Sequence, residues 1–340
     1  MIAIKILLKS PLCRGKVRVN QMAKFYTKEE YQKIADMYGL GEVQKISRLH
    51  IGFGMSTKAA VRTSSGRFVV SKNILSDKKD IVSKSKESLQ YEIDMLNAVK
   101  GLPVPVYRLS THGNFIEKFG CDWITVYDFI PGKSPKKITI PMAYEVGKFL
   151  GKFHKRAQKF KKDLAVRRKY YDLNPDVMNA MEPYADQQAN PKLKSIVEDI
   201  KKGVVDNRPP FKLPQGPIHV DIGHTNELFD GNKLTGIIDF GNFYLGPFMI
   251  DVGKTVMWNF CPNRKLDKRL FKEFIAGYNS ERKFSKTEQA YLRKAILYAI
   301  YSHIWVDLYH VPIKYVPESW PLMLIRRFLP VARQIEKDGV

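Results

Sequence analysis

H-V-D-I-G-H-T-N at residues 219–226 and G-I-I-D-F-G at residues 236–241 are the most informative segments of this chain. The first places a carboxylate at Asp221 and an amide at Asn226. The second places another carboxylate at Asp239, directly before Phe-Gly. A loop Asp can accept the proton of an attacking hydroxyl, and an Asn oxygen and a second Asp are hard ligands that suit Mg²⁺. The pattern therefore indicates a phosphoryl-transfer site.

The residues between these segments predict a hairpin. Residues 227–229 and 234–239 have the character of short strands, and Asp-Gly-Asn at 230–232 is typical of a tight turn. Such a hairpin brings Asn226 and Asp239 to the same end of a ribbon, where one metal ion could bind between them. Taken singly, these residues also fit ordinary loops, in which polar side chains hydrogen-bond to the backbone of turns or cap helices. Their order and spacing together favour the catalytic interpretation.

Earlier in the chain, the pattern predicts a strand, a glycine-rich loop, a second strand, a turn and a third strand. The strands are expected at 43–49, 57–62 and 68–72. Gly52 and Gly54 would let backbone N–H groups approach phosphates, and Ser56 closes the same loop. Lys72, at the end of the third strand, would pair with the α- and β-phosphates of a nucleotide. The alternative is a plain hairpin with an unrelated lysine.

A helix is predicted next, at about 84–99, with Glu92 beside its apolar stripe. A buried carboxylate needs a partner, so we expect Glu92 to reach Lys72, although a solvated surface Glu is the simpler alternative. The apolar run at 123–132 predicts a buried strand. Backbone groups near Asp128 and Ile130 would bind adenine there, and an ordinary core strand is an equal alternative.

With these segments in place, the chain resembles the superfamily of aminoglycoside phosphotransferases and choline kinases. The resemblance extends from about Val43 to about Met257 and is most specific at 213–251, 101–106 and 130–154. Within the superfamily the chain resembles the bacterial type II homoserine kinases. F-I-P-G-K-S-P, E-V-G-K-F-L-G-K-F-H and L-P-Q-G-P-I-H-V-D carry that likeness.

The resemblance implies an α+β, two-lobed, protein-kinase-like fold with a small β-rich N-lobe and a larger, mainly helical C-lobe. It also implies ATP and Mg²⁺ as cofactors. By position, Asp221 would be the catalytic base, with His219 organising its loop, and Asn226 and Asp239 would bind the metal. Asp251, in M-I-D-V-G, would be a structural Asp that supports the catalytic loop.

Two departures from the family pattern concern the loop and the acceptor. The residue between His and Asp, usually Gly or Ala, is Val220. A β-branched residue there is expected to require a negative φ. After Asp239 the chain reads F-G-N-F-Y-L-G-P, which differs from the aromatic-rich sequence expected of homoserine kinases. His224 could touch the acceptor or only solvent.

We expect residues 1–21 to form a disordered extension, 22–131 the nucleotide-binding N-lobe, and 132–340 the C-lobe with the catalytic loop and acceptor-binding helices. Helices are predicted at 141–155 and 190–206, from a capping box at 285–288, and after 320. Trp258, Trp305, Asp307 and Tyr309 are possible acceptor contacts, but core packing is the more ordinary role for each.

Composition fits a large folded enzyme. The chain has 340 residues, of which 44% are hydrophobic, and no apolar run long enough to span a bilayer. Three scattered cysteines predict a reducing, cytoplasmic location. The net charge of +23 comes from widely spread lysines, so we expect a solvated surface and no specific nucleic-acid partner. It also disfavours polycationic aminoglycosides as acceptors.

These observations favour an ATP-dependent kinase for a small hydroxyl compound, with homoserine or a similar amino acid or amino alcohol preferred. An aminoglycoside, choline or sugar kinase of the same superfamily is one alternative. A non-catalytic nucleotide-binding module is another. A protein Ser/Thr kinase is disfavoured because H-R-D and a long activation segment are missing. The sequence leaves the oligomeric state open.

Overall fold

The computed structural model describes residues 25–49, 57–73, 75, 85–164 and 169–340. The predicted extension at 1–21 and the glycine-rich loop with Gly52, Gly54 and Ser56 lie outside these residues. The described residues form two compact units. The first unit is drawn from 1–100 and 104–130, and the second from 101–103 and 131–340.

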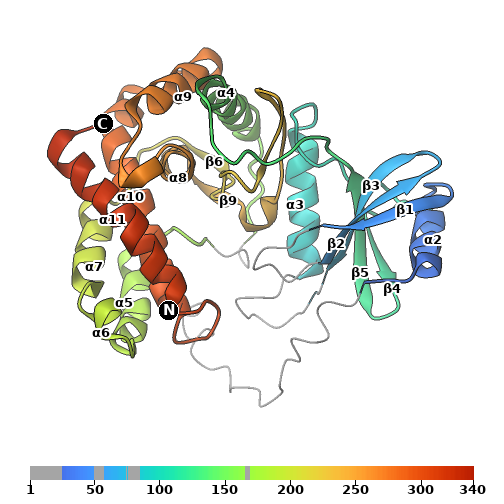
Figure 1. Cartoon of the computed structure of the whole chain (residues 1–340), viewed down its shortest axis with the longest axis horizontal. Coiled ribbons are helices and arrows are strands. Elements are labelled where there is room, and N and C mark those ends of the chain that lie inside the picture. The colour runs from blue at the N-terminus through green and yellow to red at the C-terminus, as the bar shows by residue number, and fades with distance from the viewer. Residues whose placement is uncertain (1–24, 50–56, 74, 76–84, 165–168) are drawn as a thin grey trace. The chain divides into compact units, whose positions relative to one another are not determined.

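The first unit contains a five-stranded antiparallel sheet in the order β1-β2-β3-β5-β4. Its strands are β1 (Val43–Arg48), β2 (Thr57–Thr63), β3 (Gly66–Asn73), β4 (Ile116–Phe119) and β5 (Asp122–Asp128). Helices α2 (Lys28–Met37) and α3 (Lys86–Ala98) lie on its two sides (Figure 1). This unit is the β-rich part that the sequence predicts.

Alternation along the strands divides the core of the first unit into two layers. Towards α2, Val70 and Ile124 from adjacent strands pack with Ile34 of the helix. Towards α3, Trp123 and Ile116 pack with Leu89 and Ile93. Successive side chains on β3 or β5 therefore face α2 and α3 in turn.

The second unit is mainly helical. Its longer helices are α4 (Ile140–Ala157), α5 (Pro175–Asp186), α7 (Val197–Asp206), α8 (Phe248–Asn259), α9 (Lys268–Glu281), α10 (Lys286–His310) and α11 (Ser319–Asp338). The remaining elements are α6 (Pro191–Lys194), η2 (Phe240–Asn242), η3 (Pro262–Arg264), β6 (Gln215–Ile218), β7 (Glu227–Asp230), β8 (Lys233–Ile237) and β9 (Tyr244–Pro247). The predicted α+β fold class, with a β-rich and a larger helical part, is confirmed.

Helix α10 is the centre of the second unit. It packs against α5, α7, α8 and α11, and it is buried along most of its length (Figure 1). The predicted capping box starts it, because the Ser285 hydroxyl accepts from Glu288 N while the Glu288 carboxylate accepts from Ser285 N. The helix predicted at 190–206 is interrupted, and Asn190 caps only the short α6.

Helices α4 and α9 pack closely because glycines leave room for the facing backbone. A Cβ on Gly147 would lie 2.1 Å from the Phe274 carbonyl oxygen, and one on Gly277 would lie 2.1 Å from the Tyr144 carbonyl oxygen. The contact fixes α4, which carries His154 towards the site described below. Across the described residues, none of the helices combines the length and apolar character that a bilayer crossing needs.

Candidate active site

The carboxylate of Asp251, buried on α8, holds the loop that leads to Asp221. It accepts from His219 N at 2.7 Å and from Val220 N at 2.5 Å. His154 adds a third contact, with Nε2 donating to Asp251 Oδ2 at 3.2 Å. Neither His219 nor Asp251 exposes any of its surface. These contacts support the structural role that the family resemblance implies for Asp251.

Val220 adopts a left-handed backbone with φ of 64°. The expectation that a β-branched residue here requires a negative φ is therefore wrong. Such a conformation costs a non-glycine residue roughly 1–3 kcal/mol and persists where the surroundings over-determine it. Asp251 supplies part of that constraint because it binds the N–H group of Val220 and that of His219 before it, while His219 Nδ1 accepts from Asp221 N after it.

His219 links the loop to the segment before Phe240. Its Nδ1 accepts from Asp221 N at 3.2 Å, and its Nε2 donates to the Ile238 carbonyl oxygen at 3.0 Å. Its ring also meets the edge of Phe240 at 4.5 Å between centroids. The two bonds fix the tautomer of the imidazole, and they support the predicted role of His219 as organiser of the loop.

Asn226 joins Asp221 to the hairpin. Its Nδ2 donates to the Asp221 carbonyl oxygen at 2.8 Å and to Asp221 Oδ2 at 3.1 Å. Its own carbonyl accepts from Ile238 N at 2.9 Å, next to Asp239. The hairpin of β7 and β8 has the expected tight turn, with Gly231 at φ of 56°. Asn226 and the residue before Asp239 are thus hydrogen-bonded neighbours.

The surroundings of Asp221 favour the basic role assigned to it. Burial raises its pKa, the neighbouring His219 and Lys254 oppose that rise, and the charge of Asp239 adds to it. A carboxyl with a raised pKa is a stronger base once ionised than a solvated Asp.

The oxygen donors at this point fit Mg²⁺ bound jointly with phosphate. Because Nδ2 of Asn226 is directed at Asp221, Oδ1 is the atom that could coordinate a cation. Asp239 has a left-handed backbone, with φ of 67°, directly before η2. In the part of the chain that the structure describes, no cluster of three or more His, Cys, Asp or Glu could hold a metal alone. Mg²⁺ commonly binds through one or two protein groups and substrate phosphates.

The predicted pairing of Lys72 with Glu92 is wrong. Lys72 is opposite Ile124 in the sheet register and therefore faces α2, where Nζ lies 2.8 Å from Asp122 Oδ2. Glu92 is buried on α3, on the other face, where the Tyr107 hydroxyl donates to Oε1 at 3.4 Å. Ser71, one position earlier, is on the face of β3 that is directed towards α3.

The predicted adenine contacts are only partly compatible with the structure. Asp128 N donates to the Val106 carbonyl oxygen at 3.1 Å, so this N–H is not the adenine donor. The Asp128 carboxylate is bound by Arg108, with Nε at 2.6 Å and a second guanidinium nitrogen at 3.0 Å. The assignment of backbone groups near Ile130 stays a prediction, as do those of Gly52, Gly54 and Ser56.

A buried polar cluster around Lys254 was not predicted from the sequence. Lys254 of α8 is fully buried, with Nζ 3.5 Å from the centroid of the Tyr171 ring and in contact with His303 Nδ1. The Tyr171 hydroxyl also donates to His303 Nδ1, at 2.9 Å. The one available signal was a lysine inside the apolar run M-I-D-V-G-K-T-V-M-W.

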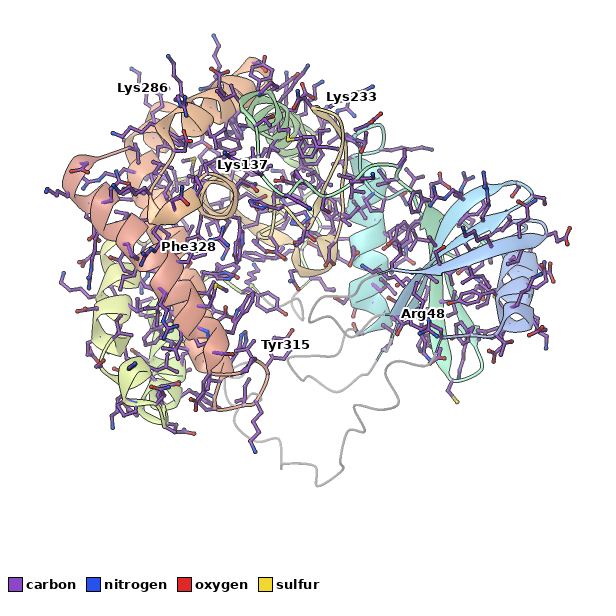
Figure 2. All side chains as sticks on the ribbon, in the orientation of Figure 1. Arg48, Lys137, Lys233, Lys286, Tyr315 and Phe328 are labelled. Atoms are coloured by element: carbon purple, nitrogen blue, oxygen red, sulfur yellow. The ribbon has the colours of Figure 1, made fainter. Side chains whose placement is uncertain are left out.

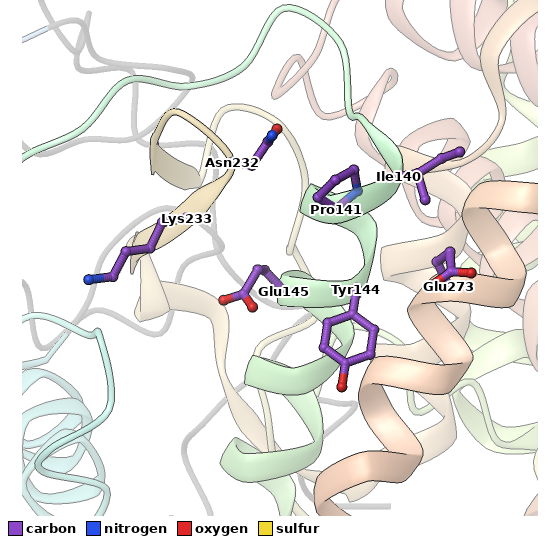
Figure 3. Close-up of a pocket in the computed structure, with 7 residues that line it drawn as sticks. All are labelled: Ile140, Pro141, Tyr144, Glu145, Asn232, Lys233 and Glu273. Atoms are coloured by element: carbon purple, nitrogen blue, oxygen red, sulfur yellow. The ribbon is translucent and has the colours of Figure 1, made fainter.

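Two surface features are separate from this site. A hollow of about 640 Å³ lies between α4, α9 and the β7–β8 turn (Figure 3). Its lining residues are Ile140, Pro141, Tyr144, Glu145, Asn232, Lys233 and Glu273, none of which is a predicted site residue. Lys137, Lys233 and Lys286 lie exposed at separate places on the second unit (Figure 2), in keeping with a dispersed positive charge.

Comparison with known proteins agrees with this geometry. A homoserine kinase from Neisseria meningitidis serogroup B is 25% identical over 78% of this chain and 84% of its own length. The structure of a microcompartment-associated aminopropanol kinase has a TM-score of 0.66 at 15% identity and covers 91% of this chain and 98% of that one. An amicoumacin kinase in complex with AMP-PNP, Ca²⁺ and Ami has a TM-score of 0.63 at 15% identity, with 92% and 93% covered.

The sequence model of the phosphotransferase enzyme family matches residues 47–287. That range spans most of the chain and contains the catalytic loop, the hairpin and Asp251. The resemblance stated from the sequence is confirmed. The chain belongs to the phosphotransferase enzyme family.

Proposed function

We propose that this protein transfers the γ-phosphoryl group of MgATP to the hydroxyl of a small amino acid or amino alcohol, with homoserine favoured. The observation that carries the proposal is the convergence of Asp221, Asn226 and the residue before Asp239 through three hydrogen bonds. Membership in the phosphotransferase family gives the reaction class.

Each residue has a definite task in this proposal. Asp221 accepts the proton of the acceptor hydroxyl and orients the oxygen for attack on the γ-phosphorus. Asn226 fixes the Asp221 side chain through Nδ2 and, with Asp239, would hold Mg²⁺ through oxygen atoms. Mg²⁺, when bound, neutralises charge on the phosphates. Asp251 and His219 keep the loop in the strained conformation that presents Asp221.

Two observations support ATP as the nucleotide. The sequence has a glycine-rich loop between β1 and β2, with Gly52, Gly54 and Ser56 as its candidate phosphate contacts. The similar amicoumacin kinase was solved with AMP-PNP, a nucleoside triphosphate analogue. Lys72 has no part in this proposal because it faces α2.

The acceptor class rests on the relatives. One relative is a homoserine kinase and one similar structure is an aminopropanol kinase, and both named acceptors are small amino compounds with a hydroxyl. A non-catalytic module is disfavoured because Val220, which departs from the family pattern, is accommodated by the bonds from Asp251.

The direct test measures ADP release in MgATP with a panel of hydroxyl acceptors, using the wild type, Asp221→Asn and Asp239→Ala. We expect Asp221→Asn to lower turnover by about 10²- to 10⁴-fold, the usual contribution of a general base, while MgATP still raises the melting temperature. Asp239→Ala should also lose the Mg²⁺-dependent part of that thermal shift. Asp230→Asn, on the exposed turn, is the matched control and should keep full activity. Unchanged turnover in Asp221→Asn would exclude Asp221 as the base.

A further inference from the structure

One stripe of α8 faces the catalytic loop along its length. Asp251 binds the N–H groups of residues 219 and 220. Trp258, two turns later, backs the loop at Gly223, where an added Cβ would lie 3.1 Å from the Trp258 Cβ. Lys254 lies between them at the i+3 position from Asp251 and the i−4 position from Trp258, so it shares their stripe. Its side chain is therefore directed at the stretch of loop that carries Asp221.

The direct contacts of the Lys254 ammonium are uncharged. They are the face of the Tyr171 ring, with the centroid at 3.5 Å, and Nδ1 of His303. Burial lowers the pKa of His303 to about 3, so this imidazole carries no charge at neutral pH. Among the residues described, no carboxylate oxygen lies within ion-pair distance of Lys254 Nζ.

The carboxylates of the same region have partners of their own. Asp307 accepts from Trp320 Nε1 at 2.8 Å and from His310 Nδ1 at 3.3 Å. Asp251 is bound by the loop and by His154, and Asp221 is bound by Asn226. They act on Lys254 only at longer range.

Burial lowers the pKa of the Lys254 ammonium well below its usual value, because its desolvation is not repaid by a short-range anion. Burial of Lys254 without an anionic partner has a functional reason if a bound ligand supplies the negative charge. In the proposed function, the acceptor is the ligand that binds at Asp221. It would approach Lys254 from the catalytic loop. The chemical group that fits a primary ammonium there is a carboxylate.

We propose that Lys254 binds the carboxylate of the acceptor and so selects hydroxy amino acids over amino alcohols. This inference rests on the proposed function and sharpens it. The acceptors named for the homoserine kinase relative and the aminopropanol kinase structure differ in this respect, since homoserine carries a carboxylate and aminopropanol does not.

The test compares L-homoserine with 3-aminopropanol, its analogue without the carboxylate, in the wild type, Lys254→Met and Lys254→Arg. We expect the wild type to favour homoserine in kcat/KM by roughly 10- to 150-fold, the range of a charge-assisted hydrogen bond of about 1.5–3 kcal/mol. Lys254→Met should bring that ratio close to one by raising KM for homoserine more than KM for aminopropanol, while any change in kcat through the charge on Asp221 is shared by both acceptors. Lys254→Arg should restore part of the ratio. Lys272→Met, on the exposed side of α9, is the control for loss of a lysine.

The outcomes separate the two proposals. ADP release with aminopropanol as efficient as with homoserine in the wild type overturns the role of Lys254 and leaves the kinase assignment standing. A Lys254→Met variant that is equally impaired towards both acceptors also overturns it. If Lys254→Met fails to fold, inhibition of the wild type decides: 2-aminobutyrate should compete with homoserine, and propylamine should not. Absence of ADP release with every acceptor overturns the proposed function and this inference with it.

Discussion

Val220 provides the sharpest test of the loop geometry. It is 2% exposed, it adopts φ of 64°, and its N–H is bound by Asp251 at 2.5 Å. Replacement by Ala and by Gly removes the same branched side chain but differs in backbone strain. Only Gly takes a left-handed conformation freely, whereas Ala retains a penalty of about 1–2 kcal/mol there.

The magnitude follows from comparing Val220 with a buried valine in an ordinary helix. At Val256 of α8, which is 0% exposed, Ala should be more stable than Gly by about 2 kcal/mol. About 1 kcal/mol of that comes from helix propensity and about 0.8 kcal/mol from the buried methyl group. At Val220, the buried methyl and the entropy of the unfolded chain favour Ala by about 1–2 kcal/mol, and the left-handed penalty cancels that advantage. At position 220 the Ala and Gly variants should therefore have about the same free energy of unfolding.

Urea unfolding of the four variants, followed by tryptophan fluorescence, measures both differences in unfolding free energy. Trp258, Trp305 and Trp320 all lie in the second unit, so the signal reports mainly on the unit that contains both valines. The comparison between sites cancels most of the uncertainty in each absolute free energy. If the Ala and Gly variants differ in unfolding free energy as much at position 220 as at position 256, Val220 is not left-handed. The idea that Asp251 holds a strained loop would then also be refuted.

Three further predictions concern other parts of the molecule. Lys72→Met should leave MgATP affinity within roughly threefold, because Lys72 contacts Asp122 and the Tyr26 ring on the α2 face, and the partly exposed ion pair is worth about 1 kcal/mol or less; a titration showing loss of nucleotide binding would contradict this. Burial raises the pKa of Glu227 from 4.5 to about 8, so its protonated form stabilises the fold fully below pH 4.5, and that stability is lost as pH rises to about 8. Glu227→Gln should therefore gain stability relative to the wild type between pH 6 and 8 by about 1.4 kcal/mol per pH unit at most, whereas a pH-independent difference in unfolding free energy would exclude the raised pKa. Gly147→Ala should destabilise the second unit by about 1–3 kcal/mol, because its Cβ would lie 2.1 Å from a backbone oxygen of α9; an unchanged melting temperature would show that the two helices can separate at no cost.

The hairpin that joins Asn226 to Asp239 was predictable because its geometry is local. Asn226 and Asp239 are the ends of one tight hairpin, and a two-residue turn with Gly231 leaves little freedom in how the strands pair. The helix starts marked by Ser285 and Asn190 were equally local, since a cap acts within one turn. In contrast, the left-handed φ of Val220 depends on a carboxylate 31 positions away, which no neighbouring residue announces.

The assignment of Lys72 failed through a property of strands. Successive side chains point to opposite faces, so an error of one residue moves a side chain from α3 to α2. The run F-V-V-S-K-N is apolar and then polar without alternation, and it does not reveal which of Ser71 and Lys72 shares a face with Glu92. The register with β5 decides it, because Lys72 is opposite Ile124, whose side chain is in the layer with α2.

The acceptor side was beyond sequence reasoning for a different reason. Lys254 and His303 are 49 positions apart, and Tyr171 and His303 are 132 positions apart, so the cluster exists only once α8, α10 and the segment before α5 have packed together. From the sequence alone, a lysine within an apolar helix gives no sign of a function, because its neighbours in space are not known. Because helices from distant parts of the chain assemble this side, a change in one of them can alter the acceptor while the catalytic loop stays the same.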